Sequence, residues 1–353
     1  MGAVVGWDIG GAHLKAARAE NGRIVKAIQI AAPLRLGLER LYQSFAEAKV
    51  QIGEADCHAV TMTGELADTF SSRAEGVVSL TAAAERELGH VLIYAGRVGF
   101  VAPAAAAQHI ADIASANWFA SASVVGKAIG AALFMDMGST TTDIVPIVNG
   151  SVAAHGYTDA ERLACGELVY TGLVRSFLMA SADRAPFAGG WSELIRENFA
   201  NMADVHRILG SLPEGTDRMP TADGRAKTVA ASQARLARMV GRDLVDAGDA
   251  AWTALAQWFA ETQTRAVADA ASLVLSRGQL PADAPVVVAG VGAPVLREVA
   301  RRLRRKYVDF DGLLDTAADA RAAASASAPA VAVAILGYLA YTRGAPMKQC
   351  RDA

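Results

Sequence analysis

The sequence is poor in cysteine and aromatic residues and carries almost no net charge. Its 353 residues include three cysteines, Cys57, Cys165 and Cys350, which lie far apart. An odd number of widely spaced cysteines does not favour a disulfide framework, and without closely spaced pairs there is no zinc motif. This usage is typical of a reducing compartment, so we expect a cytoplasmic protein.

The charge balance and the apolar runs exclude further classes of partner. The formal net charge is −2, which argues against electrostatic binding of nucleic acid or of an anionic membrane. No basic region precedes an apolar stretch at the N-terminus, so we expect no signal peptide. The late apolar run 329–341 is shorter than the ~20 residues of a membrane span and predicts a buried helix.

Histidines are few and form no known catalytic pattern. None of the six lies in a serine–histidine–aspartate or HExxH arrangement, so hydrolytic triads and zinc-protease chemistry have no support. Hydrophobic residues, in contrast, make up 52% of the chain. This content and the length suit two domains with large cores.

Two short segments, residues 4–15 and 134–145, carry the strongest chemical signal. Each is an apolar strand that ends in an acidic residue, Asp8 or Asp136, and continues through a glycine turn into a polar return strand. A carboxylate at a strand end can hold Mg²⁺, which favours few carboxylates combined with phosphate oxygens. We therefore expect Mg²⁺ as the cofactor, with Asp8 and Asp136 as its ligands.

The turns of these two hairpins suit phosphate groups. Glycine has no Cβ, so backbone N–H groups of the turn can approach a phosphate closely, and hydroxyl side chains and a lysine add donors. The expected phosphate-binding residues are Gly10, Gly11, Lys15, Gly138, Ser139, Thr140, Thr141 and Thr142. Taken alone, either hairpin is equally well explained as an Asp-Gly turn between two core strands.

Strand and turn signals predict two α/β domains. Residues 3–9, 13–19 and 23–30 are expected to be strands, and Asn21-Gly22 is a hairpin turn signal between the last two. The pattern of strand, phosphate turn and strand returns after residue 131. We expect the first domain over residues 1–130, joined by a C-terminal helix at 329–353, and the second over residues 131–328.

The second domain carries two further expected features. A helical insertion is predicted at about 160–280, with amphipathic helices at 190–209 and 228–277. Residues 286–294 read as a buried strand, a glycine turn and a helix start. Gly290 and Gly292 lie in that turn, where a nucleotide base or an equivalent group could rest.

Other polar residues are candidates for the same site. Glu65 follows an expected strand at 58–63, and sites in open α/β sheets gather at the C-terminal ends of strands. It could be a general base, a metal ligand or a substrate contact, or it could complement a helix dipole. Arg73 and Glu75 follow soon after and could line the same mouth or belong to a solvated loop.

Four candidates come from later segments. Asn117 and Trp118 start a helix of small residues, where a tryptophan is more often core packing than an aromatic platform. Tyr170 lies in a glycine-bordered polar segment that suits a cleft or a plain turn. Asp204 belongs to an expected helix and could reach the cleft from the insertion or lie on a surface.

These segments resemble the actin-like ATPase superfamily, whose two phosphate loops and adenosine loop occur in this order over nearly the whole chain. Within it, the sequence is similar to hydantoinase/oxoprolinase proteins linked to tetrahydromethanopterin one-carbon metabolism. The matching motifs are DIGGAxxK at 8–15, TMTGELAD at 61–68, RxEGV at 73–77, ANW at 116–118, DMGSTTTD at 136–143 and GELVYTG at 166–172. The resemblance implies two actin-like, ribonuclease H-like α/β domains that face a central cleft.

The resemblance also implies a reaction. Archaeal members join a furan-methyl diphosphate to the phenol of γ-glutamyltyramine, which forms an aryl ether and releases pyrophosphate in methanofuran biosynthesis. The loops would then hold the diphosphate of the substrate, with Mg²⁺. A carboxylate would take the phenol proton, with Glu65 as first candidate and Asp143 and Asp204 behind it. Trp118 or Tyr170 could flank the ring or the developing cation.

Two other functions stay open at this stage. The phosphate loops alone favour an ATP-dependent kinase of a small metabolite, and actin-like folds also serve as nucleotide-switched binding proteins. The latter is weakest, because the sequence shows no polymerisation or peptide-binding module. The expected partners are small-molecule substrates, without nucleic acid or membrane, and a homodimer is left open.

Overall fold

The computed structural model describes residues 2–343. Residues 344–353, which include Cys350 and the end of the expected C-terminal helix 329–353, lie outside the described residues. The chain divides into two compact units. The first consists of Met1–Phe134, Val145–Asp159 and Val308–Ala353, and the second of Met135–Ile144 and Ala160–Tyr307.

The first unit contains a six-stranded sheet in the order β3-β2-β1-β4-β5-β6. β1 pairs antiparallel with β2 and parallel with β4, so the sheet is mixed. Asn21 and Gly22 have φ angles of 52° and 83°, as the predicted hairpin turn requires. The strands are β1 (Ala3–Ile9), β2 (His13–Glu20), β3 (Arg23–Ala31), β4 (Cys57–Met62), β5 (Val91–Tyr94) and β6 (Phe100–Val101).

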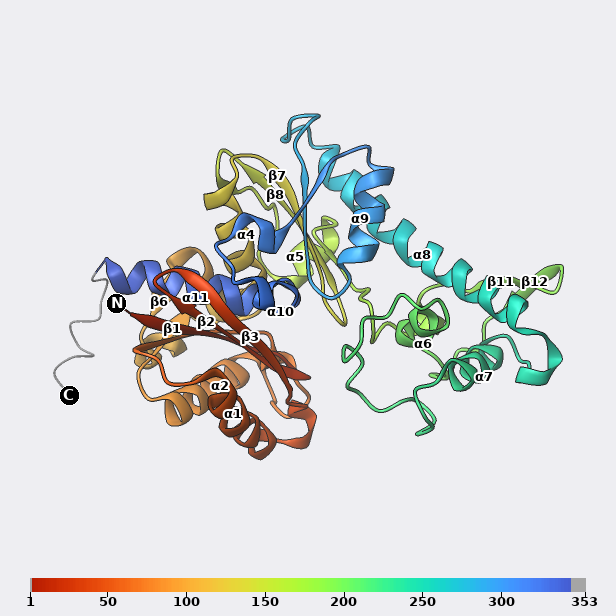
Figure 1. The fold of residues 1–353 in the computed structure, drawn as a ribbon, viewed down its shortest axis with the longest axis horizontal. Helices are drawn as coiled ribbons and strands as arrows, with labels where there is room; N and C mark the ends of the chain where they lie inside the picture. The colour runs from red at the N-terminus through yellow and green to blue at the C-terminus, as the bar shows by residue number, and fades with distance from the viewer. Residues whose placement is uncertain (1, 344–353) are drawn as a thin grey trace. The chain divides into compact units, whose positions relative to one another are not determined.

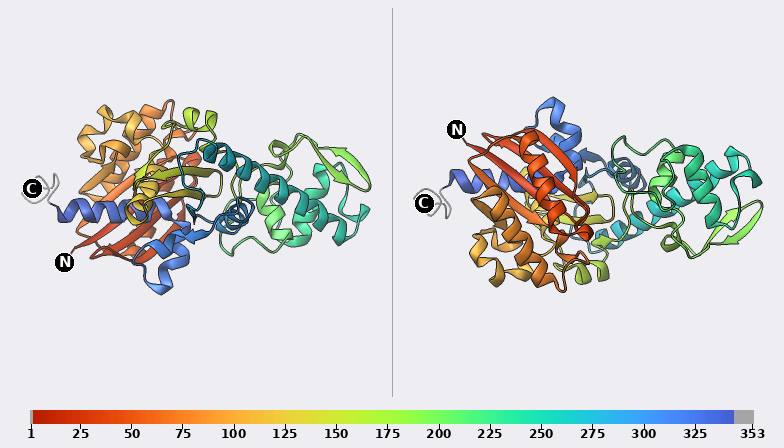
Figure 2. Two further views of the ribbon diagram at one scale, coloured as in Figure 1. Left: turned by 90° about the horizontal axis from the view of Figure 1, so that it is seen from above. Right: turned by 90° about the horizontal axis from the view of Figure 1, so that it is seen from below.

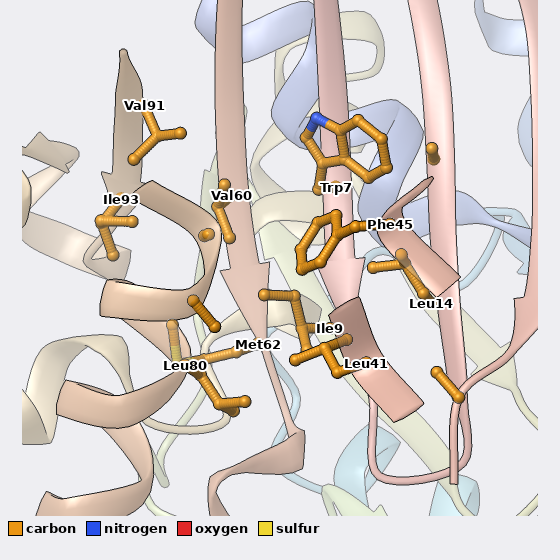
Figure 3. Close-up of a cluster of buried hydrophobic side chains, with 14 of the residues drawn as sticks. Trp7, Ile9, Leu14, Leu41, Phe45, Val60, Met62, Leu80, Val91 and Ile93 are labelled. Atoms are coloured by element: carbon orange, nitrogen blue, oxygen red, sulfur yellow. The ribbon is translucent and has the colours of Figure 1, made fainter. Parts of the chain in front are cut away.

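Helices cover both faces of this sheet. α1 (Leu38–Ile52) and α2 (Arg73–Leu88) lie on one face, and α11 (Ala328–Thr342) lies across the other (Figures 1 and 2). Between the sheet and the first pair of helices, the rings of Trp7 and Phe45 are 5.4 Å apart within a closed apolar cluster (Figure 3). Burial on both sides explains why β1 and β4 read as nearly continuous apolar runs.

α11 packs directly on β1 through a glycine contact. A Cβ at Gly6 would overlap the backbone of Ala330 and Ala334. The helix is buried along most of its first three turns, which confirms that the last apolar run is a core helix of the first unit. Among residues 2–343, no single helix is long and apolar enough to span a membrane; one pair, residues 318–326 and α11, passes only together and is bent by 111°.

A second sheet has the order β10-β8-β7-β13-β14, with β9 paired to β8. The turn between β8 and β9 is formed by Asn149 and Gly150, both at positive φ, as predicted. Its strands are β7 (Ala132–Met137), β8 (Thr142–Val148), β9 (Ser151–Val152), β10 (Leu168–Val169), β13 (Val286–Ala289) and β14 (Tyr307–Asp309). Both sheets are accompanied by helices, so the fold is of the mixed α/β class.

The predicted helix over 190–209 is wrong. The chain instead forms a hairpin of β11 (Arg184–Phe187) and β12 (Gly190–Glu193), and a helix only at α6 (Met202–Ile208). Ala188 and Gly189, both at positive φ, form the tight turn of this hairpin. The spacing of the apolar residues gave no indication of this turn. Periodicity in a window of this length does not distinguish a short helix from a hairpin with partly buried residues.

The predicted helix over 228–277 is interrupted. It divides into α7 (Val229–Met239) and the long α8 (Asp249–Leu275), because Gly241 adopts a φ of 68° and the chain leaves the helix there. α6, α7, α8 and β11 enclose a separate apolar core in which Phe187 stacks on Trp252. The remaining helices are α3 (Ile110–Ile113), α4 (Asn117–Ala128), α5 (Asp159–Ala164), α9 (Ala293–Arg302) and α10 (Arg321–Ala326).

We expect Gly6→Ala to destabilise the protein by about 3 kcal/mol, because the added Cβ would displace the α11 backbone from the sheet. The measurement is the free energy of unfolding from urea denaturation followed by circular dichroism. Gly312→Ala is the control in the same unit, since a Cβ there meets no atom within 4 Å. Equal stability of the two variants would contradict this packing.

Candidate functional site

The first hairpin ends β1 with a buried carboxylate. Asp8 is 4% exposed and lies between Lys15 of β2 and Thr61 of β4 in the sheet register. The Gly10 N–H donates to the His13 carbonyl over 2.9 Å and closes the turn. Gly11 is exposed, and a Cβ there would meet nothing within 4 Å, so its backbone is accessible. This arrangement within the first unit suits an anion at the turn and a cation at Asp8.

The second hairpin is held by the segment that follows it in the second unit. The Gly138 N–H donates to the Thr141 carbonyl over 2.9 Å, and the N–H of Arg175 donates to the Ser139 carbonyl over 2.8 Å. The Thr142 hydroxyl donates to the Thr171 carbonyl over 2.7 Å. A Cβ at Gly172 would overlap the Thr140 backbone, so the segment approaches the turn at backbone distance. The turn is therefore fixed before any ligand binds.

Two residues that the sequence analysis did not single out support this segment from the helices. The Gln263 amide of α8 donates to the Thr171 hydroxyl and the Gly172 carbonyl over 2.9 and 2.8 Å. Its oxygen lies 3.0 Å from Nε2 of His206, which belongs to α6. Burial lowers the pKa of His206, so this ring is neutral at pH 7. An isolated glutamine in an amphipathic helix gave no signal for this role.

The third glycine segment lies against Asp136. Gly290 has a φ of 84°, and a Cβ there would overlap Asp136 Oδ1 and the Met137 carbonyl. A Cβ at Gly292 would overlap the Met137 side chain, while the Gly292 N–H donates to the Met137 carbonyl over 2.9 Å. The two glycines allow the β13–α9 turn to reach the end of β7. The structure thus brings Asp136, Gly290 and Gly292 together.

Glu65 is the most buried carboxylate among the candidates of the first unit. It lies in a 3₁₀ turn directly after β4 and is 1% exposed, and the Ser115 hydroxyl donates to its Oε1 over 2.7 Å. Burial raises the pKa of Glu65, and Asp159 adds to this rise, while the Ser115 hydrogen bond and the Arg73 guanidinium lower it. A buried carboxyl with a raised pKa is suited to accept and release a proton near neutral pH.

Arg73 joins this group through Asp159, a residue that the sequence analysis missed. Its Nη2 lies 3.2 Å from Asp159 Oδ2, and the Ser115 hydroxyl lies 3.3 Å from the same oxygen. Glu75, in contrast, accepts from the hydroxyl and the N–H of Ser71 just before α2, and these hydrogen bonds lower the pKa of this exposed carboxyl. No local pattern marks Ser115 or Asp159, because their partners are about 50 residues away.

The aromatic candidates differ in exposure. Trp118 is 2% exposed and packs against Phe119 and Tyr157, and its backbone N–H donates to the Asn117 side-chain oxygen over 2.7 Å. Tyr170 is 70% exposed and belongs to the second unit. Of the two, only Tyr170 presents its ring to solvent.

The remaining acidic candidates are ion-paired within the second unit. Asp143 lies 2.9 Å from the guanidinium of buried Arg162. Asp204 Oδ1 accepts from Arg235 over 2.7 Å, from Arg207 over 3.2 Å and from the hydroxyl of Ser232 over 2.8 Å. Asp204 is 3% exposed and also caps α6. Its surroundings are those of a structural ion pair between α6 and α7.

The donor set limits the kind of cation that could bind. In residues 2–343 no three His, Cys, Asp or Glu side chains cluster as a metal site would require. One carboxylate at each hairpin fits Mg²⁺, which keeps waters and takes phosphate oxygens as ligands.

The structure is that of an α/β protein with two glycine-turn hairpins, each with a carboxylate near the end of its first strand. The chain matches the hydantoinase/oxoprolinase family over residues 56–338 and belongs to that family. A nucleotide-free acetone carboxylase structure is similar in fold, with a TM-score of 0.57 at 10% identity over 94% of this chain and 70% of that chain.

Two archaeal relatives are closer in sequence. A protein of Methanocaldococcus jannaschii is 32% identical over 245 residues, which cover 68% of this chain and 72% of the relative. A protein of Methanococcus vannielii is 36% identical over 112 residues, which cover 32% of this chain and 50% of the relative. Both are named (4-{4-[2-(gamma-L-glutamylamino)ethyl]phenoxymethyl}furan-2-yl)methanamine synthase.

We expect Asp204→Ala to destabilise the protein by about 3–5 kcal/mol, because it leaves the buried guanidinium of Arg235 without its main partner. Thermal and urea unfolding measure the effect. Asp183→Ala is the matched control, since the Asp183–Arg196 pair is exposed and its loss changes stability little. A stably folded Asp204→Ala protein without activity would instead give Asp204 a part in the reaction.

Proposed function

We propose that this protein is a transferase of furan-cofactor biosynthesis that forms the aryl ether named in its archaeal relatives. The carrying observation is the 32% identity to the Methanocaldococcus jannaschii synthase over 68% of the chain. The substrates would be an aminomethyl-furan methyl diphosphate and the phenol of γ-glutamyltyramine, or a close analogue. The products are the ether and pyrophosphate. The reaction joins two small molecules and consumes no ATP.

In this proposal the glycine turns bind the diphosphate of the furan substrate. The exposed backbone at Gly11 and the fixed turn at Gly138–Thr142 supply N–H and hydroxyl donors. Lys15, beside Asp8 in the sheet register, adds a positive charge. Such donors stabilise the charge that develops on a departing pyrophosphate, and they do so most effectively when they are fixed in advance.

Asp8 of the first hairpin and Asp136 of the second are each proposed as a carboxylate ligand for Mg²⁺, which also takes phosphate oxygens. Both carboxylates are buried at strand ends, with exposures of 4% and 8%, and Gly290 brings the third glycine segment against Asp136. When bound, the cation supplies charge neutralisation to the leaving group.

The phenol proton would be taken by Glu65. Its carboxyl is buried, carries a raised pKa and is hydrogen-bonded on one oxygen by Ser115. As the C–O bond of the diphosphate breaks, the phenol oxygen attacks the methylene carbon and its O–H proton passes to the carboxylate. Asp143 and Asp204 stand behind Glu65 as bases, because guanidinium partners already occupy their oxygens. Exposed Tyr170 is the better placed of the two aromatic candidates to meet a ring.

The test is a pyrophosphate-release assay without ATP. Purified protein, Mg²⁺, the aminomethyl-furan methyl diphosphate and γ-glutamyltyramine are mixed, and pyrophosphate and product mass are recorded. We expect both pyrophosphate and an ether of the combined mass, and both should disappear with EDTA. ADP formation from ATP with another small metabolite, and no ether, would instead make the protein a kinase.

Asp8→Asn and Asp136→Asn should each lower kcat/KM by roughly 100-fold or more, because each removes a charge from the cation and the leaving group. The steady-state rates of ether formation measure the effect, with Asp183→Asn as an exposed control. Full activity of either variant would overturn the role proposed for that carboxylate.

A further inference from the structure

The Ser115 hydroxyl lies between two carboxyl groups of very different exposure. It is 2.7 Å from Glu65 Oε1 and 3.3 Å from Asp159 Oδ2. The Glu65 residue is 1% exposed, whereas the side chain of Asp159 is 24% exposed. The serine thus connects a carboxyl sealed from water to one that reaches it.

A hydroxyl has a single hydrogen, so Ser115 can donate to only one of its two carboxyl neighbours at a time. The other contact is a hydrogen bond only when that carboxyl carries a proton and donates to the serine oxygen. The buried Glu65 is the group that burial favours in its neutral form. When Glu65 is ionised the serine donates to it, and when Glu65 is protonated the same distances fit a chain in which Glu65 donates to Ser115 and Ser115 donates to Asp159.

The surroundings fix the two ends of this chain. Arg73 of α2 lies 3.2 Å from Asp159 Oδ2 and forms an ion pair with it. At the other end, Glu65 Oε2 accepts no hydrogen bond from any of residues 2–343. One oxygen of Glu65 is engaged by the serine, and the second is a buried acceptor. The charged groups that face Glu65 are Arg73 and Asp159.

We propose that Ser115 and Asp159 form a proton relay that carries the proton of Glu65 to solvent. In one step, the Glu65 O–H bond breaks and an O–H bond forms at Ser115 Oγ, while the original Ser115 proton passes to Asp159. Asp159 then releases this proton to water. The relay returns Glu65 to the carboxylate form. Only the identity of the proton source, the phenol, rests on the proposed function.

A first test follows the proton without any substrate. The infrared C=O band of neutral Glu65, identified by its loss in Glu65→Gln, is followed after transfer into D₂O. We expect its exchange to slow at least about tenfold in Ser115→Ala and in Asp159→Asn, because general acid–base pathways lose such factors when a member is removed. Unchanged exchange in both variants would overturn the relay.

Titration of the same infrared band measures the pKa of Glu65, which should shift in opposite directions in the two variants. Ser115→Ala removes a hydrogen bond that lowers the pKa of Glu65, so its midpoint should move to higher pH. Asp159→Asn removes a negative charge that raises this pKa, so its midpoint should move to lower pH. A midpoint that does not move in Ser115→Ala would show that the serine does not share the proton.

Turnover supplies the second test. We expect kcat of ether formation at its pH plateau to fall about tenfold or more in both variants, with little change in KM. If Asp159 acted only through its charge, Asp159→Asn would shift the acid limb of the pH profile of kcat and leave the plateau value of kcat unchanged. That result would overturn the relay. Ser44→Ala is the control, since Ser44 is fully buried in α1 and donates only to backbone carbonyls.

The relay and the proposed function fail in different ways. Slow exchange in both variants with no ether formed by the wild-type protein would support the relay and overturn the proposed reaction. Ether formation with unchanged exchange and an unchanged kcat plateau would overturn the relay and support the reaction.

Discussion

Backbone approach at glycine is the constraint on which the second half of the candidate site depends. Gly172 lets its segment reach the Gly138–Thr142 turn, and Gly290 lets the third glycine segment reach Asp136. Neither contact is compatible with a Cβ, so the turn and the carboxylate are positioned by main chain and not by adaptable side chains. Donors fixed in this way need little rearrangement when negative charge develops beside them.

In the first unit, the buried carboxyl of Glu65 is subject to opposing influences on its pKa. Glu65 lies behind α2, whose Gly76 allows the helix backbone to contact the Glu65 backbone. Burial alone would hold the carboxyl neutral, but the serine hydroxyl and the arginine of α2 oppose that effect. The balance of these opposing influences sets the pH at which such a group changes its charge.

The sequence was most informative where structure is local. The hairpins at Asn21-Gly22 and Asn149-Gly150 and the turns that follow Asp8 and Asp136 were predicted, because the residue types that form them are adjacent in the chain. The helix expected over 190–209 was wrong, since a two-residue turn decides that segment. Ser115 and Gln263 could not be found at all, because their partners lie 50 and about 90 residues away.

The hydrogen bonds of Gln263 have a consequence for the dynamics of the second unit. One amide joins the long helix α8 to the segment beneath the phosphate turn, and the same side chain meets the neutral ring of His206 on α6. A local opening of α8 at this point would release the turn as well. Gln263 therefore couples α6 and α8 to the Gly138–Thr142 turn, and the opening of one of these elements weakens the support of the others.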